Sequence, residues 1–188
     1  MSAQLYLGKY RGLVTDNDDP MQLGRLRARV PAVLGKLETG WALPCVPYAG
    51  AGSGLYTVPE PGSNVWIEFE GGNPELPIWD GCFWTEDGLP AAPGGKPATP
   101  TAKMLRSEQG LVVALDDDRQ VITISSQNGG DLLEIRVRDG LLRLKASSRL
   151  LLDAPQIELA EGAPHPLVFG DALLQYLNQV VALFNTHI

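Results

Sequence analysis

The stretch VITISSQNGGDLLEIRVRDGLLRLKA, residues 121–146, contains three short runs in which aliphatic and polar residues alternate. The turn segments QNGGD and RDG separate these runs. Because successive side chains of a strand point to opposite faces, each run gives a strand with one aliphatic face and one wet face. The stretch therefore predicts a sheet of short β-strands.

Similar runs lie on both sides of this stretch, at LVVAL (111–115), RLLLD (149–153) and QIELA (156–160). Together they predict one β region over residues 104–169. Its aliphatic face is expected to comprise Ile122, Ile124, Leu133, Ile135, Val137, Leu142, Leu144, Leu150, Leu152, Ile157 and Leu159.

This aliphatic face needs something to pack against, because burying each such side chain contributes about 1.5–3 kcal/mol. The region contains almost no aromatic residues and no helix that could cover it. Three identical chains around one axis, each with its aliphatic face inward, would bury the face and remove exposed strand edges. The interpretation is a trimeric, intertwined β-prism or triple-stranded β-helix. The alternative is an ordinary meander packed on the first domain.

A C-terminal helix is predicted over residues 170–188. Leu173, Leu177, Val180 and Phe184 follow one another at spacings of four, three and four residues, and His187 continues the series. This is a heptad seam, which is typical of helices that associate in parallel. A helix of this length is only marginally stable alone in water, so we expect a three-stranded bundle.

The first 86 residues predict a separate, mainly β domain. Candidate strands alternate with turn segments and are Tyr6–Thr15, Gly24–Val30, Trp41–Val46, Ser63–Glu70 and Pro77–Phe83. Leu26, Ala28 and Val30 fall on one face of their strand, as do Val65, Ile67 and Phe69 of another. Five such strands fit a small closed barrel, most commonly an OB-fold. The proline-rich segment 87–103 is expected to be a linker.

Composition restricts the classes of partner. Lys and Arg number 15 against 22 Asp and Glu, a formal net charge of −7, which disfavours nucleic acid as a partner because phosphate contacts need basic side chains. No stretch of eighteen apolar residues could span a membrane, and the N-terminus has no apolar signal segment. The chain is therefore expected to stay in the cytosol unless another route exports it. Cys45 and Cys82 are expected to be buried thiols, with a disulfide as the alternative.

Three segments of the barrel region carry a resemblance to a known family: GLVTDNDDPMQLGRLRARVP (12–31), WALPCVPYAG (41–50) and YTVPEPGSNVWIEFEGGNPELPIWDGCFW (56–84). They resemble, in order and spacing, the N-terminal OB-fold of the phage baseplate spike family. That family includes baseplate assembly protein V and the tail-spike domains of type VI secretion tip proteins. The β runs and the ending PLVFGDALLQYLNQVVALFN (166–185) are more loosely similar to the C-terminal parts of such spikes.

The resemblance implies a homotrimeric, non-enzymatic spike. Its OB-folds would bind beneath the hub ring of the tail tube, and the β-prism would point outward, so that sheath contraction drives it into the target cell envelope. Loops 16–22 and 48–58 are candidates for the hub contact. The chain would be assembled in the bacterial cytoplasm and reside in a virion tail baseplate or an equivalent injection particle, with a tip-capping protein as a further partner.

Two departures from the family pattern concern chemistry. Some relatives carry a lysozyme domain after the OB-fold, where this chain has only residues 87–103. Others end in a His-x-His pair that holds iron, whereas this chain ends Asn185-Thr186-His187-Ile188. Three His187 side chains near a trimer axis could hold a metal. The competing interpretation is a plain terminal residue, and no cofactor is expected.

No motif of nucleophilic, nucleotide or zinc chemistry is present in the sequence. GAGSG (50–54) is expected to be a barrel loop, and Asp116, Asp117 and Asp118 a solvated turn. Two other functions compete with the structural spike. One is a binding module for an oligosaccharide or single-stranded nucleic acid, with Trp41 and Trp66 as stacking residues. The other is a cell-wall hydrolase, for which no paired carboxylates are evident.

Overall fold

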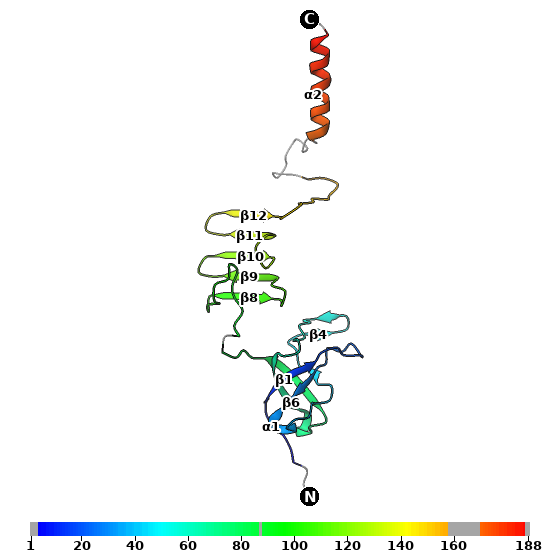
Figure 1. The fold of residues 1–188 in the computed structure, drawn as a ribbon, viewed down its shortest axis with the longest axis vertical. Coiled ribbons are helices and arrows are strands. Elements are labelled where there is room, and N and C mark those ends of the chain that lie inside the picture. Colours follow the sequence, from blue (N-terminus) through cyan, green and yellow to red (C-terminus); the bar gives the residue numbers. More distant parts are fainter. Residues whose placement is uncertain (1–3, 87, 158–169, 187–188) are drawn as a thin grey trace. The chain divides into compact units, whose positions relative to one another are not determined.

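The computed structural model describes residues 4–86, 88–157 and 170–186 (Figure 1). These residues divide into two compact units. The first comprises Met1–Ala91 with Gly95–Ala98, and the second comprises Ala92–Gly94 with Thr99–Ile188. Each unit is described by itself below.

The first unit is built on a five-stranded sheet in the order β2-β1-β6-β7-β3. Neighbouring strands are antiparallel except for β3 and β7, which are parallel. A bridge between Leu26 and Ala42 joins residues beside β2 and β3, the two ends of this order, so the sheet closes into a barrel. The strands are β1 (Tyr10–Asp16), β2 (Arg27–Arg29), β3 (Leu43–Pro44), β6 (Asn64–Phe69) and β7 (Pro77–Cys82).

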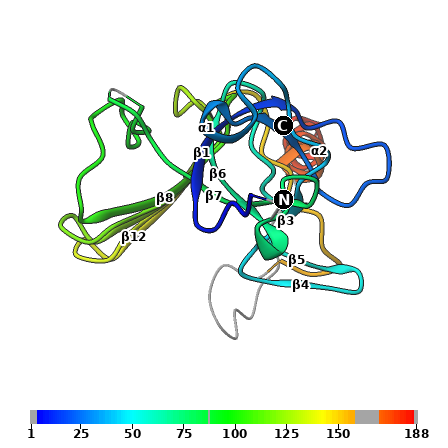
Figure 2. The same cartoon turned by 90° about the horizontal axis from the view of Figure 1, so that it is seen from below.

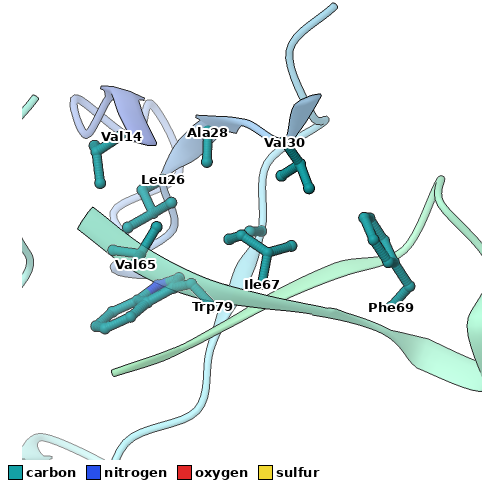
Figure 3. Close-up of a cluster of buried hydrophobic side chains, with 9 residues drawn as sticks. Val14, Leu26, Ala28, Val30, Val65, Ile67, Phe69 and Trp79 are labelled. Atoms are coloured by element: carbon teal, nitrogen blue, oxygen red, sulfur yellow. The ribbon is translucent and has the colours of Figure 1, made fainter. Parts of the chain in front are cut away.

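The barrel core includes the alternating apolar residues that the sequence pattern indicated (Figure 3). Leu26, Ala28 and Val30 are fully buried, and their arginine neighbours lie on the other face. The remaining core members are Val14, Ala42, Val65, Ile67, Phe69 and Trp79. The mainly β fold with an N-terminal OB-like domain and a C-terminal helix is therefore confirmed.

Short elements between the strands were not predicted. Helix α1 (Pro31–Leu34) begins at a proline, whose fixed φ suits the first helical turn, and ends before Gly35, whose φ of 60° is not helical. GAGSG was expected to be a loop but forms most of a hairpin of β4 (Ala49–Gly50) and β5 (Ser53–Gly54). A 3-10 turn, η1, spans Glu70–Gly72. The expectation of buried thiols was wrong, since Cys45 and Cys82 are both free and exposed.

The second unit contains a five-stranded antiparallel meander in the order β12-β11-β10-β9-β8. Each strand pairs with its neighbours in sequence, and the strands lie over one another when viewed along the stack (Figure 2). The strands are β8 (Ala102–Arg106), β9 (Val112–Asp116), β10 (Val121–Ser125), β11 (Leu132–Arg136) and β12 (Leu141–Lys145). Helix α2 spans Gly170–Asn185.

One expectation about this region needs correction, while the intertwined trimer stays a prediction. In the single chain β9, β10 and β11 have both edges paired with neighbouring strands. The outer edges of β8 and β12 have no paired strand among the described residues. The run at 149–153 was expected to be a strand but has no regular structure. A strand needs a paired neighbour, and this run has none among the described residues.

Candidate functional site

The strand register places the predicted aliphatic residues side by side on one face of the meander. Ile122 pairs with Ile135, and Ile135 pairs with Leu142. In a parallel column, Ile124 pairs with Leu133, which pairs with Leu144. We call this surface the aliphatic face. It comprises Leu105, Val113, Leu115, Ile122, Ile124, Leu133, Ile135, Leu142 and Leu144, with Lys103 at one corner.

This aliphatic face is exposed in the single chain. Leu133 is half-buried, and the other eight side chains are between 37% and 62% exposed. The opposite face is the covered one, because Val112, Ala114 and Val121 are buried there. A contiguous exposed apolar surface of this kind marks an interaction site in a soluble protein.

Three members of the aliphatic face were missed by sequence reasoning. Leu105 lies on β8, whose first two residues were assigned to the linker and whose other three lay outside the predicted runs. Val113 and Leu115 belong to LVVAL, which is apolar throughout and so shows no alternation from which to choose a face. The signal that could have found them is register, because the four-residue turn 117–120 fixes Leu115 opposite Ile122.

The other predicted interface residues do not lie on this sheet. Leu150 and Leu152 are exposed and Ile157 is half-buried, all outside regular structure. Leu159 and His187 lie outside the described residues. On α2, Leu173, Leu177 and Val180 are 44–48% exposed and Phe184 is 69% exposed.

Helix α2 carries a wide apolar face with no charged flank. Leu174, Tyr176, Val181 and Leu183 flank the heptad seam and are exposed. Residues 172–186 contain no Asp, Glu, Lys or Arg. Gln175, Asn178 and Gln179 form a polar strip. Residues 172–186 therefore lack the charged residues that usually set partner choice, so a bundle of such helices would depend on packing.

A buried ion pair shapes the loop that follows β1. Asp19 Oδ1 accepts a hydrogen bond from an Arg25 guanidinium nitrogen at 2.6 Å. The same carboxylate accepts the backbone N–H groups of Met21, Leu23 and Arg25. The Arg25 guanidinium and these amides hold the pKa of Asp19 well below its ordinary value, and Asp19 in turn raises the pKa of Arg25. The pair fixes the path of residues 19–25.

We expect Asp19→Asn to lower the melting temperature of the barrel unit by at least about 5 °C, measured by thermal unfolding at pH 7. The substitution leaves Arg25 in its site without a counter-charge. Asp18→Asn is the matched control, because Asp18 is exposed and its side chain makes no hydrogen bond among the described residues.

The same pair predicts acid sensitivity. The folded Asp19 binds a proton only far below the unfolded value near 4, so stability is present above pH 4 and falls as the pH drops toward the folded pKa. The Asp19→Asn variant lacks this carboxylate, so it should lose less stability than the native chain as the pH falls. Acid sensitivity equal to that of the native chain would contradict the assigned role.

The two loops proposed for partner contact lie together on the barrel. Asn17 Nδ2 donates to the Pro59 carbonyl at 3.1 Å, which ties the loop after β1 to the segment before β6. Gln22, Leu23 and Gly24 line one cleft together with residues of the segment 44–58. Met21, Tyr48 and Tyr56 are exposed nearby in sequence.

Aromatic residues proposed for ligand stacking lie in two separate clusters. The guanidinium of Arg27 lies 4.8 Å from the ring centroid of Trp41, with Arg25 at 5.6 Å. Trp66 packs against Phe83 at 4.8 Å, and the Arg11 guanidinium lies 5.7 Å from Phe83. Trp41 therefore lies beside Arg25 and Arg27, whereas Trp66 lies beside Arg11.

Within the part of the chain that the structure describes, no group of three or more His, Cys, Asp or Glu side chains could hold a metal ion. The acidic turn after β9 makes ordinary polar contacts: Asp117 pairs with Lys103, and Asp118 accepts a hydrogen bond from Thr101. No described helix is both long and apolar enough to cross a bilayer.

Comparison with known protein families gives a match for the barrel. Residues 10–84 match the family described as the type VI secretion system/phage-baseplate injector OB domain. The match begins at the first residue of β1 and ends two residues after β7, so it covers the closed sheet. A comparison with curated proteins gives no match.

Proposed function

Because residues 10–84 are an OB domain of the type VI secretion and phage-baseplate injectors, we propose that the chain is the central spike of such a contractile machine. A baseplate-associated structural role follows from the family. The finer proposal is a homotrimer that docks beneath the hub, points its second unit outward and pierces the target envelope when the sheath contracts.

The observation that carries this proposal is the exposed aliphatic face. Of its nine aliphatic side chains on five strands, eight are exposed and Leu133 is half-buried among the described residues. Three copies facing one axis would each cover the others' aliphatic faces as the three sides of a prism. The in-chain pairing of β8–β12 supports a prism with one sheet per side and not a shaft of interwound strands over residues 102–145.

The proposed mechanism is mechanical. Force from the contracting sheath would pass from the hub through the barrels into the prism. The apolar contacts between three sheets and between three α2 helices would share the load, so separation requires breaking many contacts at once. The proposed role needs no catalytic centre.

Sedimentation velocity of the full chain at micromolar concentration tests the assembly. We expect a single species of about three times the chain mass of 20.2 kDa. Native mass spectrometry at the same concentration provides an independent check. A stable monomer would overturn the proposal, because the aliphatic face would then be permanently open to water.

The alternative is a module that binds single-stranded nucleic acid or an oligosaccharide, and the cluster of Arg11, Trp66 and Phe83 is the observation that favours it. Stacked aromatics beside an arginine are typical of single-strand binding sites. Against it, the chain carries a net charge of −7. We expect no binding of a fluorescent oligothymidine at low salt. Micromolar binding that Trp66→Ala abolishes would favour the alternative.

A further inference from the structure

A hollow lies at one side of the meander, along one column of the aliphatic face. Its volume is about 560 Å³. Its lining includes four residues of that column and four turn residues, namely Leu105, Val113, Ile124 and Leu133 with Ser107, Leu111, Ser126 and Asp131. Because β8 and β10 run in the same direction, the turns 107–111 and 126–131 that follow them lie at the same side of the sheet. We call this the hollow side.

Three polar side chains on the rim of the hollow are already bonded within the chain. Ser107 Oγ accepts the backbone N–H of Leu111 at 3.0 Å, and Ser126 Oγ accepts that of Asp131 at 3.1 Å. Asp131 Oδ1 accepts a hydrogen bond from Ser147 Oγ at 2.9 Å. The hollow therefore offers an occupant mainly apolar contact.

The opposite side of the sheet carries exposed aliphatic side chains at the same levels. Its column is between 37% and 62% exposed and comprises Leu115, Ile122, Ile135 and Leu142. Val137 continues this column, because it lies two residues after Ile135 and its backbone N–H donates to the Gln120 carbonyl at 3.0 Å. Val137 is 60% exposed and lies just beyond the end of β11. We call this the Val137 side.

A cyclic trimer would bring the two sides together. Contacts in such a ring are heterologous, so one side of each chain meets the other side of the next chain. In the proposed prism, whose strands stack along the axis, rotation without translation keeps each strand at its own level. The Val137 side of β11 in one copy would therefore meet the turn 126–131 on the hollow side of the next copy.

We propose that Val137 of one copy packs into the hollow of the next copy, against Ile124 and Leu133. Ile135 would line the same corner beside it. This inference rests on the proposed trimer, which supplies the next copy. Each chain has one hollow side and one Val137 side, so both are used when the ring closes and no corner remains for a further copy.

Photo-crosslinking of the full chain tests these corners. A chain with p-benzoylphenylalanine in place of Val137 is sedimented, and its trimer fraction is irradiated. We expect covalent dimers and trimers on a denaturing gel, because position 137 of each copy would touch the next copy. Digestion of the dimer band, followed by mass spectrometry, should show position 137 joined to residues 126–133.

Benzoylphenylalanine at Leu141 is the matched control. Leu141 lies at the same side of the sheet and is 40% exposed, but it belongs to the opposite face because it precedes Leu142. It should give a trimer by sedimentation without covalent dimers. A dimer band in which position 137 is joined to Gln120 or Ile122 would overturn the proposed corner, because two Val137 sides would then meet.

The substitution Val137→Asp tests the same contact without a bulky probe. We expect the dissociation constant of the trimer to rise at least about tenfold, because the carboxylate would be buried in the hollow. Leu141→Asp should change it less than about threefold. Equal effects of the two substitutions, or a trimer without the crosslinks from position 137, would remove the corner contact alone. A native chain that sediments as a monomer would remove the corner and the trimer together.

Discussion

Replacing Ile124 with glutamate is expected to abolish the trimer while leaving the chain folded. Ile124 lies on the central strand of the meander and is 46% exposed in the single chain, so the carboxylate meets water in a monomer. In the proposed prism it would be buried among aliphatic side chains, and burying an unpaired charge costs several kcal/mol. A cost of about 4 kcal/mol corresponds to roughly 1,000-fold in the association constant.

Sedimentation velocity across a concentration series measures this effect directly. The expected result is a species of chain mass at concentrations at which the native chain is trimeric. Leu37→Glu is the matched control, because Leu37 is an exposed aliphatic residue of the barrel unit. Circular dichroism should show unchanged β structure in both variants. A trimer that survives Ile124→Glu would exclude the aliphatic face as the assembly surface.

Replacing Leu177 with aspartate is expected to remove most of the helical signal of α2. Leu177 lies in the middle of the heptad seam, and a helix of sixteen residues is marginal in water without a partner. The charged residue would prevent seam-to-seam packing, so the helix should melt as well as dissociate. We expect the ellipticity at 222 nm to fall and the dissociation constant of the trimer to rise by about 100-fold.

The control for this variant lies on the other side of the same helix. Gln175→Asp adds the same charge in the polar strip beside Asn178 and Gln179. It should change the dissociation constant by less than about threefold, because a surface substitution costs only a few tenths of a kcal/mol. Equal effects of the two substitutions would show that α2 does not associate through its seam.

The sequence predicted those parts of the fold in which buried and exposed residues alternate along a single strand. Leu26, Ala28 and Val30 were assigned to the core because their arginine neighbours fixed the period, and all three are fully buried. Ile122 and Ile124 were assigned to the aliphatic face by the same reasoning. Their exposure in the single chain is consistent with the prediction but does not test it.

Features that depend on contacts between distant residues were not predictable. The Asp19–Arg25 pair lies within DNDDPMQLGR, where four acidic or amide residues in a row look equivalent as a turn. The cleft depends on the meeting of segments around Gly24, Tyr56 and Trp79, which are far apart in the chain. The run at 149–153 failed for a related reason, since alternation shows that a strand is possible but not that a partner strand exists.

The meander of β8–β12 has a consequence for the order of events in biogenesis. Every strand pairs with the one before it, so the sheet has low contact order and can form rapidly on a single chain. In the proposed trimer, subunit association would then be a later, concentration-dependent encounter between folded sheets. The rate at which the proposed assembly forms would therefore depend on how fast a cell makes the chain.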